Sequence, residues 1–142
     1  MIVSAKTEYA CIAMLELAAM YDRGEPVRIR EIADRHGVPS RFLVQILLQL
    51  KGAGFVISTR GATGGYQLAK SPEEITLGEV ISVVDPQPSE ISSSAGRETA
   101  ATRVLLQTFR QVDAIQREML SQTTFGDLAQ QLQSQGEGMY YI

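Results

Sequence analysis

The chain has 142 residues, of which 44% are apolar and 20% are charged, and this composition is that of one soluble globular domain. A single cysteine, Cys11, excludes an intramolecular disulfide and any metal site built from several cysteines. The longest apolar stretch, residues 10–21, is too short to cross a bilayer, and no export signal precedes it, so we expect a cytoplasmic protein without a membrane partner.

The net charge of −3 is unevenly distributed along the chain. Residues 28–70 hold seven cations against two acids, whereas residues 71–142 hold four cations against ten acids. A basic block of this kind indicates a surface that faces a polyanion, and a chance cluster on a solvated face is the alternative.

The first part of the chain predicts three helices. Residues 4–21 form a helix with Ser4 as its N-cap, and apolar side chains nearly surround it, so it should be central to the core. Residues 29–36 repeat apolar side chains at the spacing of one helix face. Gly37 can adopt the left-handed conformation of a tight turn, and another helix begins at residues 39–40. Helix, glycine turn and helix are typical of a helix-turn-helix.

The third predicted helix has an apolar side and a polar side. The polar side carries Arg41, Gln45 and Gln49. The side expected to be buried carries Phe42, Leu43, Ile46, Leu47 and Leu50.

A β-hairpin is predicted directly after these helices. Residues 55–59 have strand character, residues 60–65 form a glycine-rich tip, and residues 66–69 return as a second strand. A hairpin in this position is a wing. A short helix over residues 77–84 follows it.

The last third of the chain predicts a loop and two helices. Residues 85–96 form a loop, residues 98–120 a long helix, and residues 126–133 a final helix with Thr124 as its N-cap. A tail over residues 136–142 follows and ends in the apolar residues 139–142. Apolar side chains along the long helix recur near a seven-residue period. These seam residues are Leu105, Phe109, Val112, Ile115 and Met119. We favour pairing of this seam with another helix, and packing within its own domain is the alternative.

The chemistry of a winged helix-turn-helix predicts which residues meet DNA. The major groove admits an α-helix, whose first residues reach base edges, and the neighbouring minor groove attracts arginine. Arg41 can bond to guanine or phosphate, Gln45 to adenine, and Arg60 can enter the minor groove from the wing. The candidate contacts are Arg28, Pro39, Ser40, Arg41, Val44, Gln45, Arg60, Gly61, Gly64, Gly65 and Tyr66. The alternative role of Gly64 and Gly65 is to form an ordinary tight turn. The alternative role of Tyr66 is to pack as an aromatic side chain.

The wing sequence resembles a known family signature. Residues 60–69 read R-G-A-T-G-G-Y-Q-L-A, which resembles the R-G-x-x-G-G-Y-x-L-A wing of the Rrf2 family of bacterial transcription regulators. Four further segments are similar to that family in order, so the resemblance covers nearly the whole chain. They are residues 6–10, 29–56, 71–81 and 124–128.

The resemblance implies a homodimer, built on crossed long helices, that binds a two-fold symmetric operator on double-stranded DNA. It assigns the seam to dimerisation, and it adds Ser4 and Tyr9 as contacts to the phosphate backbone. Val44 stands where relatives often carry glutamate, a residue able to discriminate cytosine. The operator sequences that relatives bind therefore need not be those that this chain binds.

Many members of this family hold an iron–sulfur cluster through three cysteines in the loop before the long helix, and this chain has none there. The chain therefore resembles the cluster-free branch, and we expect no cofactor and no metal site. Glu8 matches a position at which some relatives supply a carboxylate ligand to the cluster. Its simpler role is that of an exposed acidic residue on the first helix. A buried structural thiol is expected for Cys11 rather than a redox sensor, and a solvated or capping residue for His36 rather than a ligand.

The expected protein is mainly α-helical, with a winged helix domain over residues 1–85, a flexible loop over 86–97, and a dimerisation helix with a C-terminal helix and tail over 98–142. The expected function is a sequence-specific transcriptional regulator of the repressor type. The alternative is an interaction module of the same fold that docks a protein such as an enzyme of cysteine metabolism, and a small-metabolite effector is a further option. Motifs typical of an enzyme are missing from the sequence.

Overall fold

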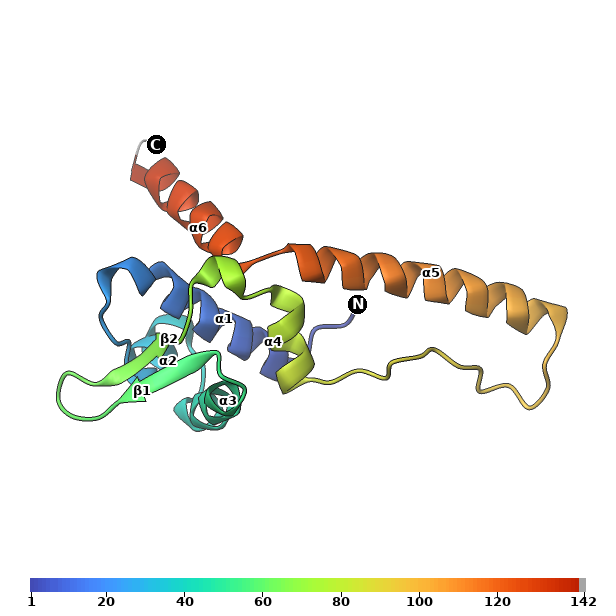
Figure 1. Cartoon of the computed structure of the whole chain (residues 1–142), viewed down its shortest axis with the longest axis horizontal. Coiled ribbons are helices and arrows are strands. Elements are labelled where there is room, and N and C mark those ends of the chain that lie inside the picture. Colours follow the sequence, from blue (N-terminus) through green and yellow to red (C-terminus); the bar gives the residue numbers. More distant parts are fainter. Residues whose placement is uncertain (141–142) are drawn as a thin grey trace.

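The computed structural model describes the backbone of residues 1–140 and the side chains of residues 1–136. The described chain is mainly helical, with one two-stranded antiparallel sheet (Figure 1). The mainly α-helical prediction is therefore confirmed. The helices and strands are α1 (Ala5–Ala19), η1 (Tyr21–Arg23), α2 (Ile29–His36), α3 (Ser40–Gly52), β1 (Val56–Thr59), β2 (Gly65–Leu68), η2 (Pro72–Glu74), α4 (Leu77–Val84), α5 (Ala100–Gln122) and α6 (Phe125–Tyr140).

Helix α1 lies at the centre of the fold, as its apolar sequence predicts. Its N-cap is Ser4, whose hydroxyl accepts a hydrogen bond from the Thr7 amide at 3.1 Å. Met14 and Leu17 are essentially inaccessible to solvent. Helices α3, α4 and α6 pack around α1, so burial on several sides stabilises it more than intrinsic helix propensity does.

Helices α2 and α3 form the predicted helix-turn-helix. Gly37 ends α2 with φ of 64°, in the left-handed region that glycine tolerates without strain. Leu43 and Leu50 of α3 are fully buried against the core. Phe42 was also expected on the buried side, and this prediction is wrong. Its side chain is 44% exposed because it lies at the edge of the apolar face, beside Tyr9 of α1, with ring centroids 6.2 Å apart.

The wing is present, although β1 begins one residue later than predicted and β2 lies one residue earlier. Val56 pairs with Leu68, and Thr59 pairs with Gly65. Phe55 lies before β1, and its carbonyl accepts a hydrogen bond from the Ala69 amide at 2.9 Å, so pairing extends beyond the two strands. Val27 adds a bridge to Tyr66 on the other side of β2. This bridge anchors the hairpin to the segment that enters α2.

Two later helices complete the core. A reciprocal capping box between Thr76 and Glu79 begins α4, and Thr124 and Asp127 cap α6 in the same way. Phe125 at the start of α6 is fully buried against the core. Helix α6 continues to Tyr140 rather than ending at the predicted residue 133, since its glycines weaken a helix without stopping it as proline would. Tyr141 and Ile142 of the predicted apolar tail lie outside the described residues.

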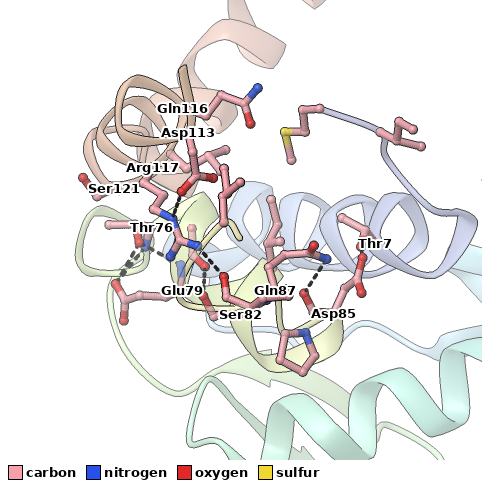
Figure 2. Close-up of a pocket in the computed structure, with 18 of the residues that line it drawn as sticks. Thr7, Thr76, Glu79, Ser82, Asp85, Gln87, Asp113, Gln116, Arg117 and Ser121 are labelled. Carbon is pink, nitrogen blue, oxygen red and sulfur yellow. Dashed lines mark hydrogen bonds and ion pairs between the residues drawn. The ribbon is translucent and has the colours of Figure 1, made fainter. Parts of the chain in front are cut away.

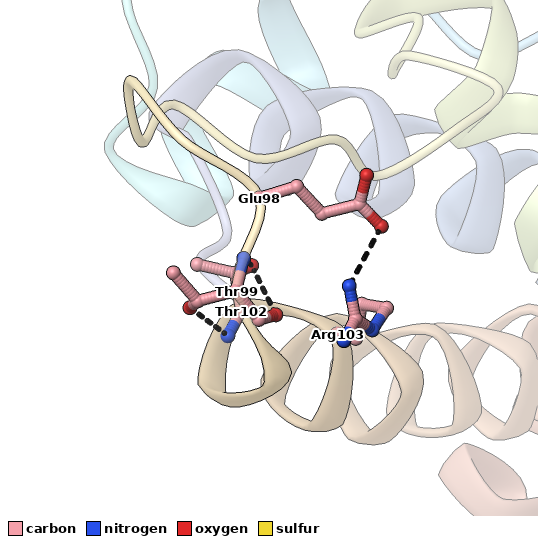
Figure 3. A network of polar contacts seen from close by, with 4 residues as sticks. All are labelled: Glu98, Thr99, Thr102 and Arg103. Atoms are coloured by element: carbon pink, nitrogen blue, oxygen red, sulfur yellow. Dashed lines mark hydrogen bonds and ion pairs between the residues drawn. The ribbon is translucent and has the colours of Figure 1, made fainter.

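Helix α5 extends away from the rest of the molecule, with the loop over residues 85–99 running beside it (Figure 1). It begins two residues later than predicted, at Ala100, because Thr99 is its N-cap. Figure 3 shows the reciprocal hydrogen bonds of Thr99 and Thr102 at this end, with Glu98 beside Arg103. Farther along, the Arg117 guanidinium donates to the carbonyl of Pro88 at 2.8 Å and so ties the loop to the helix.

Candidate nucleic-acid interface

The start of α3 presents an exposed polar end to solvent. Ser40, Arg41 and Gln45 are exposed, and Val44 between them is 41% exposed. Residues 41, 44 and 45 share one side of the helix because they follow its three- and four-residue spacing. The N-cap, Pro39, makes no side-chain cap hydrogen bond within this described helix, so the amides of Ser40 and Arg41 can meet an anion.

An aromatic cluster orients the arginine at this end of α3. The Arg41 guanidinium carbon lies 5.0 Å from the centre of the Phe42 ring, which in turn lies beside Tyr9. A cation over an aromatic face is attracted by the ring quadrupole. Tyr9 is only half-buried and stands close to α3, whereas the Ser4 hydroxyl is occupied by the α1 cap, where it bonds to Thr7.

The wing carries an exposed arginine at its tip and glycines packed against the protein itself. Arg60 is exposed beside Gly61, whose φ is 105°. A Cβ on Gly64 would overlap the carbonyl of Thr59, and one on Gly65 would lie 2.5 Å from the Val27 carbonyl oxygen. Both glycines are therefore required by close contacts within the chain, whatever else the wing touches.

Tyr66 and Arg28 meet at the base of the wing. The backbone amide and carbonyl of Tyr66 both bond to Val27, at 2.8 and 2.9 Å, and its side chain is half-buried against the core. Arg28 follows Val27 directly, is exposed, and is the N-cap residue of α2. The structure thus brings Arg28 to the base of the wing through a bridge that hydrophobic patterning does not reveal.

The exposed side of α5 carries the predicted seam. Of residues 100–122, all of which the structure describes, none is classed as buried. The seam residues are between 49% and 70% exposed, and Val104 beside them is 63% exposed. An apolar stripe of this size on a helix that extends into solvent is typical of an interaction surface.

A cavity of about 1070 Å³ lies between α4, the loop and the second half of α5 (Figure 2). Its lining includes Glu79, Asp85 and Asp113, and the Asp113 carboxylate binds Arg117 at 2.7 Å. The figure shows Asp113 beside Arg117 and Glu79 beside Thr76, with Asp85 near Gln87 and Thr7. The expectation of a small-metabolite effector stays a prediction, since Glu79 already bonds to Thr76 and Asp113 to Arg117.

The helix-turn-helix, the anchored wing and the exposed end of α3 together define a winged helix-turn-helix protein of the DNA-binding class. Comparison with known proteins identifies the family within this class. A family model described as Rrf2, iron-dependent transcriptional regulator, matches residues 3–131. The chain belongs to the Rrf2 family of transcriptional regulators, and accordingly not to a family of enzymes.

Individual relatives support this assignment along the whole chain. The transcriptional regulator CymR of Bacillus subtilis is 34% identical, with 99% of each chain covered. The regulator IscR of Aliivibrio salmonicida is 38% identical over 75% of this chain and 63% of its own. A solved structure of CymR, titled the global cysteine regulator of B. subtilis, has a TM-score of 0.76 at 32% identity and covers 92% of this chain and 97% of its own.

The residues present do not fit the iron–sulfur cluster that the family resemblance led us to consider. Cys11 is the chain's one cysteine, and burial raises the pKa of its thiol from 9.0 to about 11, which opposes the thiolate that a cluster needs. Residues 1–136, whose side chains are described, contain no group of three or more His, Cys, Asp or Glu able to hold a metal ion. Among the described helices, none is long and apolar enough to span a membrane.

Proposed function

We propose that this protein is a homodimeric, sequence-specific DNA-binding repressor that works without an iron–sulfur cluster. The observation that carries the proposal is the exposed end of α3 beside a wing with Arg60 at its tip. Inserting α3 into the major groove would bring Arg41 and Gln45 to base edges, while Arg60 enters the adjacent minor groove. Ser4, Tyr9 and Arg28 would meet the phosphate backbone, which positions the protein without reading sequence.

The exposed seam of α5 supports the dimer. A second copy of the same helix would cover Leu105, Val112 and Met119, as in a coiled coil. A two-fold pairing of this kind presents two copies of α3 to one face of a duplex, so the preferred operator would be an inverted repeat. A dimer that occupies such a site excludes other proteins from it, which is sufficient for repression.

Selection of bound DNA from a random library with the purified protein tests this proposal. We expect enriched sequences to contain an inverted repeat with half-sites about one helical turn apart, or a multiple of it. An enriched pool without a shared motif would contradict sequence-specific binding. A single protein partner recovered from cell extract in equal amounts after nuclease treatment, with no DNA preference, would favour the docking alternative instead.

A further inference from the structure

We infer that Glu16 is a positioning residue for DNA recognition, because its carboxylate fixes the end of α2 to α1 and so sets the orientation of α3. Helix α2 and the turn at Gly37 lie immediately before α3, and α3 is the helix proposed to read bases. The inference rests on the proposed DNA-binding function. It assigns a role in DNA recognition to a residue that touches no DNA.

Both oxygens of the Glu16 carboxylate are engaged. Oε2 accepts a hydrogen bond from the Arg35 guanidinium at 2.7 Å, and Oε1 lies 2.7 Å from Nε2 of His36. The Glu16 side chain is 11% exposed, whereas those of Arg35 and His36 are 62% and 30% exposed. The two partners are consecutive residues at the end of α2, so one buried carboxylate holds the whole last turn of that helix.

A carboxylate at this position is costly because it lies on the buried side of α1. Its neighbours on α1, Met14 and Leu17, are buried, and an apolar residue would avoid the desolvation of a charge. Buried ion pairs add little to stability compared with apolar packing, and fixing one geometry among alternatives is their best-attested use. Among the described residues, the side-chain hydrogen bonds between α1 and α2 come from Glu16.

The position of this contact lets it affect the orientation of α3. Helices α1 and α2 each pack on α3, and α3 begins four residues after His36, beyond a turn that Gly37 makes tight. If the end of α2 were free to move, α3 would sample several orientations. Contacts to base edges need one orientation, whereas nonspecific attraction to phosphates does not.

The test measures the ratio of selected-operator affinity to random-sequence DNA affinity, at fixed pH and salt, in parallel with the free energy of unfolding. For Glu16→Gln we expect the ratio to fall by about tenfold, because hydrogen bonds to a charged group are lost. Glu31→Gln, the same charge change on the exposed side of α2, is the matched control and should leave the ratio unchanged.

Two outcomes would overturn the inference. If Glu16→Gln is folded and keeps the wild-type ratio, Glu16 contributes to stability alone, and the proposed DNA binding still stands. If Glu16→Gln does not fold, His36→Ala decides, since the His36 side chain is partly exposed, and a folded His36→Ala with the wild-type ratio refutes the role. A wild-type protein with no preference for any DNA sequence would instead refute the proposed function, and this inference with it.

Discussion

At the scale of single residues, the wing contains one residue that we propose contacts DNA and two glycines that the fold requires. Arg60 faces solvent at the tip, whereas Gly64 and Gly65 face the protein's own backbone. Substitutions at these positions therefore report on different properties. A change at Arg60 should affect DNA binding with little effect on folding, and a change at Gly65 should affect folding first.

Arg60→Ala is expected to weaken operator binding by about 1–3 kcal/mol, because an arginine contact in a groove is lost. Gel-shift titration at fixed salt measures the loss. Arg97→Ala removes the same charge from the loop before α5 and should have little effect. Equal affinity of Arg60→Ala and wild type would show that the wing does not contact DNA.

Gly65→Ala is expected to lower the free energy of unfolding by about 1–3 kcal/mol, through backbone strain and overlap with Val27. Gly61→Ala is the control, since Gly61 also has positive φ and its Cβ would meet no atom within 4 Å. Urea denaturation compares the two. A smaller loss for Gly65→Ala than for Gly61→Ala would mean that the Val27 bridge is not rigid.

The pKa of Cys11, which burial raises to about 11, predicts how its thiol behaves with pH. Alkylation by iodoacetamide at pH 8 should be much slower in the folded protein than in urea, because the thiolate is the reactive form. The folded state keeps its proton where the unfolded state loses it, so this group's contribution to stability should fall as pH rises from 9 to 11. Rapid alkylation of the folded protein would contradict the structural role.

At the scale of the elements, α5 is a helix whose apolar side the single chain leaves uncovered. Its 23 residues span about 34 Å, enough for several turns of paired contacts. The loop beside it is held by Arg117, and also by Arg110, which donates to the carbonyl of Ile91. These bonds leave the seam free for another helix.

Val112→Glu is expected to weaken the dimer by at least about tenfold, because a charge would be buried in the seam. Ala114→Glu is the matched control, since it adds the same charge to an exposed position about 200° around the helix from Val112. Sedimentation velocity over a concentration series measures both. Unchanged dissociation of Val112→Glu would assign the seam to another partner.

At the scale of the whole molecule, an acidic chain has to bind an anionic duplex. The net charge is −3, so long-range attraction is weak and binding depends on the basic block over residues 28–70. Among the residues of that block, Arg41 and Arg60 lie at the proposed interface, whereas Arg35 is engaged with Glu16. A dimer doubles the number of contacts on one operator.

Operator affinity should therefore fall steeply with salt, with a logarithmic slope of about −0.9 per phosphate neutralised. An operator cut to one half-site should show about half that slope, because one subunit then faces DNA. Fluorescence anisotropy titrations over a range of potassium chloride concentrations provide both values. The same slope for half and full sites would contradict two-subunit binding.

Short-range features of this protein could be predicted from the sequence because they depend on neighbouring residues. The Ser4 and Thr124 caps, the left-handed Gly37 and the glycine-rich hairpin each involve groups a few residues apart. The spacing of Thr76 and Glu79 was an equally readable capping signal that the predictions did not use.

The tertiary structure alone decided the features that join distant residues. The pairing of Glu16 with Arg35 and His36, the burial of Phe125, and the exposure of Phe42 depend on how helices pack rather than on any local pattern. A hydrophobic period indicates which side of a helix is apolar, and only packing determines which part of that side another element covers. For this reason the fold was predictable from sequence, whereas the carboxylate contact behind α3 was not.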